Sequence, residues 1–253
     1  MQGVINNIQG YSVRATDGDV GKVDTIFFDD RTWAVRYLVV NVGNWLLVDQ
    51  ILLSPLAVTG VNPDDETISV SLTKEQVKNS PDVDTKKPVS RQQEITLHNY
   101  YGWDPYWLTA PAYSDGLTAV NTPHTLRRHQ TQAEPDVATR VEEPETSLRS
   151  TAEVAGYFIQ ASDGEIGHVD KFLVDTEFWM IRYLVIDTRN WLPGKKVIVS
   201  PDWIEDIDWA TSEVTVGMTR DEVKASPEYE KQGTLDRAYE QRLYDHYDQD
   251  VYW

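Results

Sequence analysis

Apolar and polar residues alternate in two neighbouring stretches near the start of the chain, residues 10–16 and 20–28. Asp17-Gly18 lies between them, and this dipeptide is typical of a type I′ β-hairpin because both residues tolerate positive φ. Further β-rich stretches follow at residues 33–42, 46–53, 56–61 and 67–72. About six short strands at such close spacing predict a closed or sandwiched antiparallel sheet.

Two helices are predicted after these strands. The first begins at Thr73, which forms a capping-box pattern with Gln76. It ends at Ser80-Pro81, because the residue before a proline avoids the α region. The second helix covers residues 91–101 and leads into a dense aromatic cluster.

The whole pattern occurs twice, 146 residues apart. Gly10 to Pro81 aligns without a gap with Gly156 to Pro227. The same register continues into the aromatic cluster, where Tyr101, Tyr106 and Trp107 align with Tyr247, Tyr252 and Trp253. A period this long indicates a domain duplication rather than a solenoid of short repeats.

We therefore divide the chain into a first copy (residues 1–107), a linker (108–146) and a second copy (147–253). The barrel covers about residues 5–73 in the first copy and about 152–219 in the second, and the helical tails cover 73–107 and 219–253. The linker is rich in Pro, Thr, Ala and Gln, and this composition predicts an extended connection. The predicted fold class is mainly β: two small antiparallel β-barrels, each followed by short α-helices and an aromatic tail, related by internal duplication.

The third strand of each copy is apolar on both faces. In the first copy, one face carries Trp33, Val35, Tyr37 and Val39, and the other carries Ala34, Leu38 and Val40. The interior of a barrel needs only one apolar face. We expect the second face to be covered by the tail, by the other copy or by a second chain.

Composition and charge narrow the function classes. A length of 253 residues suits two small domains, and the formal net charge of -18 opposes contact with nucleic acid and anionic lipid. No apolar run is long enough to span a membrane, and the first residues lack the layout of a signal peptide. The absence of cysteine excludes disulfides and thiolate sites. These features predict a soluble, cytoplasmic protein.

Arginines inside the third strands are candidates for structural ion pairs. Arg36 lies among apolar neighbours, and Asp24 or Asp29, one hairpin earlier, is the expected partner. In the second copy, Arg182 is expected to pair with Asp170 or Asp175. We interpret these arginines as parts of the fold rather than as ligand-binding residues.

Aromatic residues are the remaining candidates for binding, since the chain has nine Trp and thirteen Tyr. Such side chains anchor many protein interfaces, but they also cover apolar strands. We favour packing of the tails on the barrels and keep partner binding as the alternative. The candidate interface aromatics are Trp33, Tyr37, Trp103, Trp107, Trp179, Tyr183, Tyr247 and Trp253.

The sequence predicts no metal, cofactor or catalytic site. None of the five histidines, His98, His124, His129, His168 and His246, has a histidine at the matching place of the other copy. The duplicated Ser54 and Ser200 directly precede prolines and lack the sequence context of a nucleophile. No glycine-rich phosphate-binding loop is present. We therefore expect a protein that is not an enzyme.

Several ordered motifs resemble the PRC-barrel domain family. They are the Gly-Tyr start, the Asp-Gly-x-x-Gly-x-Val-Asp hairpin, the Trp-x-x-Arg-Tyr-Leu-Val strand, the Ser-Pro step and the segment Leu72 to Pro81. The ending Tyr100 to Trp107 is similar to the tail of stand-alone bacterial members. The resemblance covers both copies and leaves out only the linker.

This resemblance implies a non-enzymatic module for protein interaction or an accessory, stress-associated role, with an unidentified protein partner and no nucleic acid. Because the family includes the cytoplasmic domain of the photosynthetic reaction-centre H subunit, an accessory role in a photosynthetic or electron-transfer complex is the alternative. A role in ribosome maturation or with RNA is a third and weaker interpretation, because the chain is acidic. A homo-oligomer also remains open.

Overall fold

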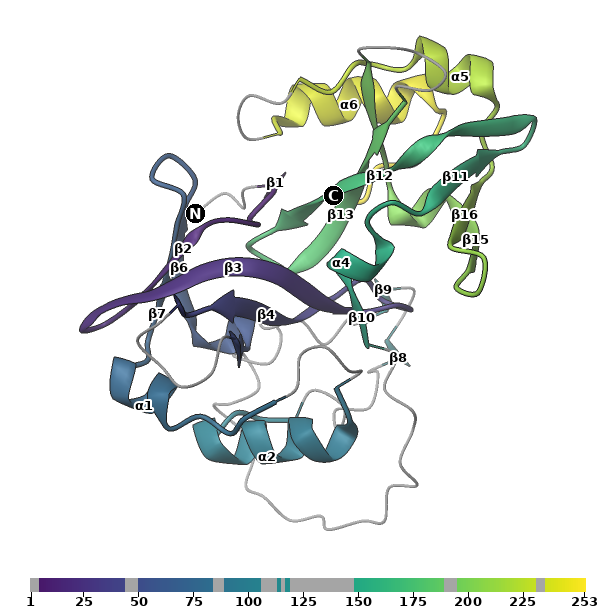
Figure 1. Ribbon diagram of the computed structural model, residues 1–253. Helices are drawn as coiled ribbons and strands as arrows, with labels where there is room; N and C mark the ends of the chain where they lie inside the picture. Colours follow the sequence, from purple (N-terminus) through teal and green to yellow (C-terminus); the bar gives the residue numbers. More distant parts are fainter. Residues whose placement is uncertain are drawn as a thin grey trace. The chain divides into compact units, whose positions relative to one another are not determined.

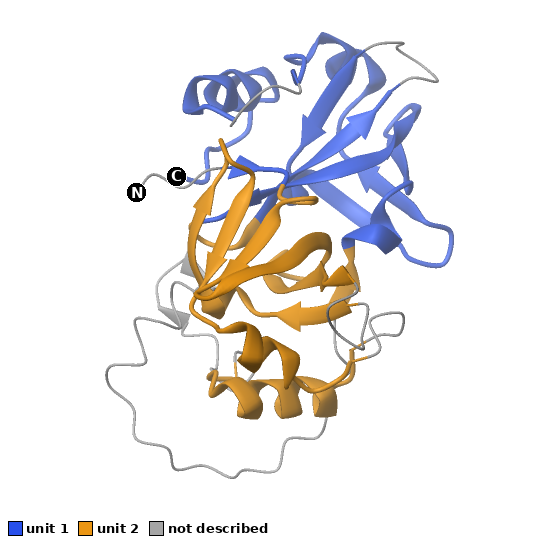
Figure 2. Cartoon of the chain, turned by 60° about the vertical axis from the view of Figure 1, so that its left-hand side comes forward, with its two compact units in different colours: residues 1–7, 151–176, 181–253 blue, residues 8–150, 177–180 orange. Residues whose placement is uncertain are grey.

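A computed structural model describes residues 5–43, 50–83, 89–105, 113–114, 117–118, 148–188, 195–230 and 235–253. The chain forms two compact units (Figures 1 and 2). The N-terminal unit, orange in Figure 2, comprises Ile8–Ser150 and Glu177–Met180. The C-terminal unit, blue in Figure 2, comprises Met1–Asn7, Thr151–Thr176 and Ile181–Trp253.

Each unit is built on a seven-stranded sheet. The elements of the N-terminal sheet and its helices are β2 (Ser12–Ala15), β3 (Gly18–Asp29), β4 (Val35–Asn41), β5 (Gln50–Leu53), η2 (Pro55–Ala57), β6 (Val58–Asn62), β7 (Thr67–Val70), α1 (Lys74–Lys78), α2 (Arg91–Tyr101) and β10 (Leu148–Ser150). Two short strands of the predicted linker, β8 (Tyr113–Ser114) and β9 (Leu117–Thr118), pair with each other.

The second copy repeats this order of elements. Its members are α4 (Thr151–Val154), β11 (Phe158–Ala161), β12 (Gly164–Asp175), β13 (Met180–Asp187), β14 (Lys196–Val199), η3 (Pro201–Trp203), β15 (Ile204–Asp208), β16 (Glu213–Val216), α5 (Arg220–Ala225) and α6 (Arg237–His246). The C-terminal sheet also contains β1 (Ile5–Asn6). The prediction of a mainly β chain with two similar halves is confirmed.

Two details of the predicted barrels are wrong. The strand orders β5-β4-β3-β2-β7-β6 and β14-β13-β12-β11-β16-β15 are open rather than closed. The sheets are also not purely antiparallel, because β2 pairs parallel with β7 and β11 pairs parallel with β16. These partners are far apart in sequence, so no tight turn forces them to run in opposite directions.

The Asp-Gly hairpins form, but not with the predicted turn. β2 and β3 pair from Ala15 to Gly18, and Gly18 has φ +143° while Asp17 is not among the residues with positive φ. The Asp17 carboxylate instead accepts a hydrogen bond at 2.7 Å from the backbone N–H of Lys74, the first residue of α1. In the second copy, the Asp163 carboxylate accepts a hydrogen bond at 2.7 Å from the backbone N–H of Arg220, the first residue of α5. The aspartate therefore joins the hairpin to a helix N-terminus.

The capping boxes form as predicted. Thr73 Oγ1 accepts the N–H of Gln76 at 3.2 Å, and Gln76 Oε1 accepts the N–H of Thr73 at 2.8 Å. Thr219 and Glu222 repeat this arrangement before α5. α2 covers the predicted residues 91–101, and α6 begins at Arg237, which aligns with Arg91. Each of these helices begins after a capping residue, Ser90 or Asp236.

The third strands are shorter than predicted at their starts. β4 begins at Val35 and β13 at Met180, because Trp33 and Trp179 have φ +57° and lie in turns. In the N-terminal turn, the Trp33 ring stacks on Phe28 with centroids 5.0 Å apart. From Val35 to Val40 every residue of β4 is buried, as the pattern predicts for a strand covered on both faces.

The ends of the duplicated copies are exchanged between the compact units. β10 precedes the second copy's strands in sequence but pairs with β3 of the N-terminal unit, with Leu148 opposite Asp29. β1 precedes the first copy's strands but pairs with β12 of the C-terminal unit, with Ile5 opposite Asp175. β3 and β12 are the equivalent long strands of the two copies. β10 pairs with the C-terminal end of β3, and β1 pairs with the C-terminal end of β12. The boundaries of the compact units therefore differ from the boundaries of the copies at these segments.

This exchange predicts that Leu148→Ala destabilises the N-terminal unit, although Leu148 belongs to the second copy in sequence. Leu148 is buried against the N-terminal core, so its truncation should cost about 2–5 kcal/mol. Hydrogen exchange of the amides of residues 27–29 should accelerate, while that of residues 173–175 should stay unchanged.

Ile5→Ala is the matched control, because Ile5 is equally buried in the C-terminal unit. It should accelerate exchange at residues 173–175 and leave residues 27–29 protected. Acceleration of both segments by either substitution would contradict the reciprocal exchange.

Candidate functional site

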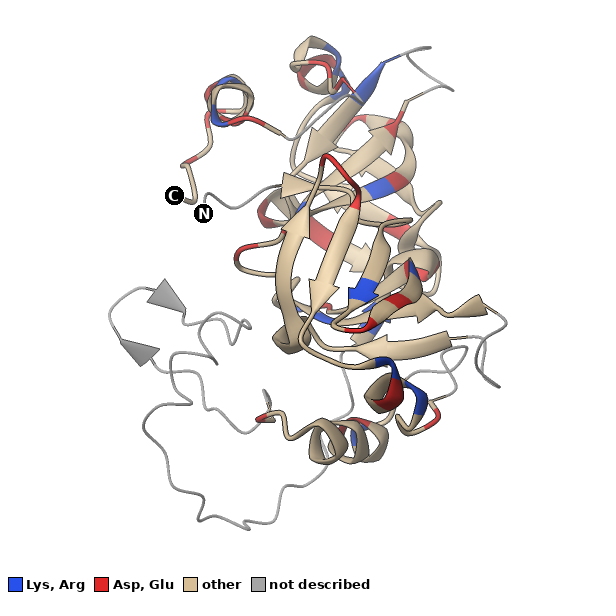
Figure 3. Cartoon of the chain, turned by 90° about the vertical axis from the view of Figure 1, so that its left-hand side faces the viewer, with Lys and Arg blue, Asp and Glu red and all other residues tan. Residues whose placement is uncertain are grey.

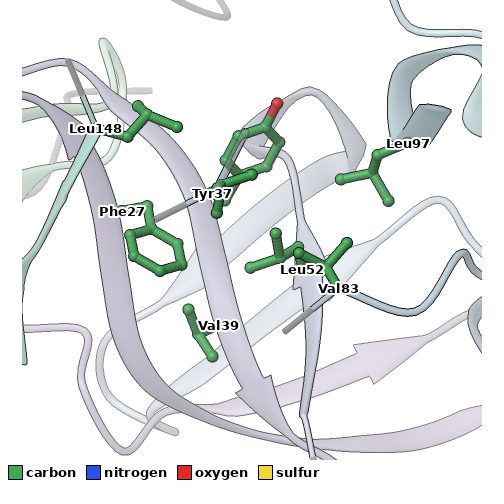
Figure 4. Packing of buried hydrophobic residues seen from close by; sticks show 8 residues of the cluster. Phe27, Tyr37, Val39, Leu52, Val83, Leu97 and Leu148 are labelled. Carbon is green, nitrogen blue, oxygen red and sulfur yellow. The ribbon is translucent and has the colours of Figure 1, made fainter. Parts of the chain in front are cut away.

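Tyr37 on β4 is the centre of the covered face in the N-terminal unit. Its side chain is fully buried in a cluster with residues of the sheet, the tail and β10 (Figure 4): Phe27, Val39, Leu52, Val83, Val89, Leu97 and Leu148. Tyr101 and Trp103 pack against the same cluster. The second apolar face of the third strand is thus covered by the tail together with a strand from the second copy.

A buried carboxylate joins the tail helix to this tyrosine. The Tyr37 hydroxyl donates a hydrogen bond at 3.0 Å to Glu94 Oε1, and it lies 3.0 Å from His98 Nε2. Glu94, on α2, is fully buried, and its Oε2 accepts a bond at 2.6 Å from Arg91 Nη1. A buried charge is costly unless it is bonded in this way, so the cluster specifies where α2 docks.

The C-terminal unit repeats the cluster with one change of partner. The Tyr183 hydroxyl donates to Glu240 Oε1 at 2.7 Å, and the Tyr252 hydroxyl donates to the same oxygen at 2.8 Å. Arg237 Nη1 lies 3.0 Å from Glu240 Oε2. The place of His98 is taken by Tyr244, which is buried.

Burial changes the acid–base behaviour of these clusters. Desolvation lowers the pKa of His98 to about 4, so its ring is neutral at neutral pH. Desolvation, followed by the nearby Tyr244 and the Glu240 carboxylate, raises the pKa of Tyr183. Burial also raises the pKa values of Tyr101 and Tyr247 to about 12. At neutral pH the His98 ring and these tyrosine hydroxyls are therefore uncharged.

Two aspartates were predicted as possible partners for each arginine. In both copies the aspartate nearer to the arginine in sequence forms the ion pair. Arg36 Nη2 lies 3.7 Å from Asp29 Oδ2, and both side chains are buried. The other carboxylate oxygen of Asp29 accepts the backbone N–H groups of Arg31 and Thr32, so Asp29 also shapes the turn between β3 and β4. Asp24 bonds instead to Gln50 Nε2 at 2.7 Å.

The second copy follows the same rule. Arg182 Nε lies 3.4 Å from Asp175 Oδ2, and its guanidinium lies 4.3 Å from the centre of the Tyr252 ring. Asp170 pairs with Lys196 at 2.6 Å. Lys196 aligns with Gln50, so the two copies differ in charge at this pair.

The candidate interface aromatics have different environments. Tyr37, Tyr183, Trp179 and Tyr247 are buried, Trp33 and Trp103 are half-buried, and Trp107 lies outside the described residues. Trp253 is 44% exposed and lies against Tyr244 and the Arg237 guanidinium, 4.0 Å from the latter. Most of the described aromatics of this set therefore pack within a unit.

The histidines within the described residues have different local environments. His98 is buried in the N-terminal cluster, and His246 Nε2 lies 2.8 Å from the Glu222 carbonyl oxygen. His168 is half-buried on β12, and His124 and His129 fall outside the described residues. Across the described ranges, no group of three or more His, Cys, Asp or Glu side chains is arranged to hold a metal ion.

The sequence analysis missed the Arg-x-x-Glu pair of the tail helices. Arg91 and Glu94 align with Arg237 and Glu240 in the same register as the barrels. Carrying the 146-residue alignment through residues 82–100 would have found both identities. The burial of Glu94 and Glu240, however, follows from the docking of the helix on the sheet and has no signature in the sequence.

Comparison with known proteins identifies one family. A model described as the PRC-barrel domain matches residues 4–77. This match covers the strands β1 to β7 and most of α1. No curated protein matches the sequence. Among the described residues, none of the helices combines the length and apolarity that crossing a membrane requires.

Tyr37→Phe should lower the free energy of unfolding of the N-terminal unit by about 1–3 kcal/mol, because it removes a donor from a buried carboxylate. Tyr100→Phe is the matched control: the Tyr100 hydroxyl also donates a hydrogen bond, to Gln76 O at 2.8 Å, but Tyr100 is exposed. Urea unfolding measures both variants. An equal loss for the two would contradict a special role of the buried cluster.

The low pKa of His98 predicts a pH dependence confined to the N-terminal unit. The unfolded chain takes up a proton on His98 near pH 6.5, whereas the folded unit does so only near pH 4. The unit should therefore lose up to about 3 kcal/mol of stability as pH falls through this window.

His98→Tyr, which introduces the residue of the second copy, should remove this component. Denaturant unfolding at several pH values, followed by hydrogen exchange in each unit, measures it. If the free energy of unfolding of the variant falls with pH as steeply as that of the wild type between about pH 6.5 and 4, groups other than His98 produce the effect.

Proposed function

We propose that the chain is a soluble, cytoplasmic tandem PRC-barrel protein that acts as a non-enzymatic module for protein interaction, on the basis of the PRC-barrel domain model that matches residues 4–77. The second copy has the same order of strands, which supports its assignment as a second such domain. A protein partner, rather than nucleic acid or a membrane, is the binding target.

One observation carries this proposal: several polar side chains that the two copies share form bonds inside each unit. Tyr37, Glu94 and Arg91 bond to one another, as do Tyr183, Glu240 and Arg237. The shared arginines of β4 and β13 lie beside buried aspartates. A catalytic group needs contact with a substrate, so residues consumed by internal bonds favour a scaffold.

The acidic character of the chain supports the choice of partner. Asp and Glu number 41 against 23 Lys and Arg, and Figure 3 shows the charged residues mainly on helices, turns and strand ends. This balance repels phosphate backbones and attracts basic protein surfaces. An accessory, stress-associated role fits such a module, and a place in a photosynthetic or electron-transfer complex is the alternative.

Affinity capture tests the proposal. The full chain, immobilised and exposed to native lysate from several growth conditions, should enrich a specific protein in a manner insensitive to nuclease treatment. An unrelated acidic protein of similar length and net charge is the control for non-specific attraction of basic proteins.

Capture of the same proteins by both baits would contradict a specific interaction. Enrichment of ribosomal particles that nuclease abolishes would favour the RNA interpretation. Recovery of the chain with a membrane electron-transfer complex would favour the alternative role.

A further inference from the structure

The two units differ most clearly on the outer face of the sheet around β11. Phe158 on β11 is 48% exposed, the largest exposed fraction among the large hydrophobic residues described. Its neighbours along the strand, Tyr157 and Ile159, are buried. The ring therefore lies on the face of the sheet opposite the core, where about half of its surface stays in contact with water.

Strand register defines the residues around this ring. Phe158 is paired with His168 of β12 on one side and with Glu213 of β16 on the other, and Glu213 is paired with Asp208 of β15. Side chains paired across strands lie on the same face. One row on the outer face thus reads His168, Phe158, Glu213, Asp208.

A second row on the same face is also acidic. Gln160 of β11 is paired with Glu165 and Thr215, and Thr215 is paired with Asp206. Glu165 and Asp206 are exposed. We call these two rows, with the ring at their centre, the Phe158 face; its members are Phe158, Gln160, Glu165, His168, Asp206, Asp208, Glu213 and Thr215.

The first copy has different chemistry at the aligned positions. The first row there is Lys22, Ser12, Thr67 and Asn62, and the second is Asp19, Arg14, Ser69 and Gly60. The Phe158 face carries four carboxylates and an aromatic ring where the N-terminal unit carries one carboxylate, two basic side chains and a serine. Because the two sheets share one framework, this difference is not required by the fold.

Hydrogen bonds hold the Asp208 carboxylate on this face in its charged form. Asp208 accepts the backbone N–H groups of Ala210 and Thr211, at 2.9 and 3.1 Å, and hydrogen bonding from Thr211 is the main cause that lowers its pKa. Such bonds fix the carboxylate in place without burying it. A positively charged side chain that approaches Phe158 therefore meets fixed negative charge on one side of the ring.

We propose that the Phe158 face binds a basic segment of a partner protein, with an apolar side chain against the Phe158 ring and Arg or Lys side chains beside Glu213 and Asp208. This rests on the proposed function and names the chemistry of the partner. An apolar anchor surrounded by complementary charge is the usual arrangement of a binding hot spot. A second copy of the chain is disfavoured as the occupant, because each molecule carries a net charge of -18.

Fluorescence anisotropy with the full chain tests the proposal. The probe is a labelled peptide of alternating Arg and Leu, and the comparison probes are Glu-Leu and Arg-Ser peptides of the same length. The wild-type chain should bind the Arg-Leu peptide most tightly, the Arg-Ser peptide more weakly and the Glu-Leu peptide not at all. Raising the salt concentration to about 0.5 M should weaken binding of the Arg-Leu peptide.

Two substitutions that introduce the residues of the first copy locate the binding. Phe158→Ser should raise the Kd for the Arg-Leu peptide about tenfold or more, and Glu213→Thr should raise it several-fold. Phe178→Thr is the matched control, because Phe178 is 38% exposed, aligns with Thr32 and lies in the N-terminal unit. It should leave the Kd unchanged, and thermal unfolding should show that all three variants are folded.

Equal affinity of wild type and Phe158→Ser for the Arg-Leu peptide would overturn the proposal, as would an equal loss in Phe178→Thr. A dimer in native mass measurements that Phe158→Ser converts to a monomer would also overturn it, because the occupant would be a second copy. If a captured partner is retained by Phe158→Ser, the proposed function stands and only this face is wrong. If specific capture fails altogether, the proposed function itself fails.

Discussion

The third strand of each copy must be covered on both faces, and the rest of the structure depends on this constraint. A strand with buried residues from Val35 to Val40 cannot face water on either side without a large loss of hydrophobic free energy. The core of the sheet covers one face. The other face needs the tail helix, and the buried bond between Tyr37 and Glu94 specifies how that helix docks.

The exchange of chain ends follows from the same geometry. β3 and β12 are long strands whose far halves extend beyond their hairpin partners, so each leaves backbone groups to be paired there. β10 and β1 pair with these segments, and each comes from before the other copy's strands in sequence. A duplicated chain thus completes each sheet with a segment of its sister copy.

Duplication also separates what the fold requires from what it leaves free. Residues shared by the copies form turns, caps, cores and internal polar clusters. Residues that differ include buried ones, such as His98 and Tyr244, and residues of the outer faces, where Ser12 and Phe158 lie on equivalent strands.

The sequence by itself determined the local elements. Alternation of apolar and polar residues identified the strands, Thr73 with Gln76 identified a helix start, and the duplication identified two equivalent halves. These features depend on neighbours within a few residues, so their physical causes are present in the sequence. The sequence left two aspartates, Asp24 and Asp29, as possible partners of Arg36. The structure shows that Arg36 pairs with Asp29, beside the turn between β3 and β4, while Asp24 bonds to Gln50.

Only the tertiary structure decided the features that depend on distant parts of the chain. The parallel pairing of β2 with β7, the exchange of β1 and β10, and the burial of Glu94 join residues with no local signature of contact. The sequence around Trp33 has the apolar pattern of a strand start, so it did not predict the positive φ of this residue. In each case the energy comes from packing and hydrogen bonds between separate elements, and propensity cannot encode which elements meet.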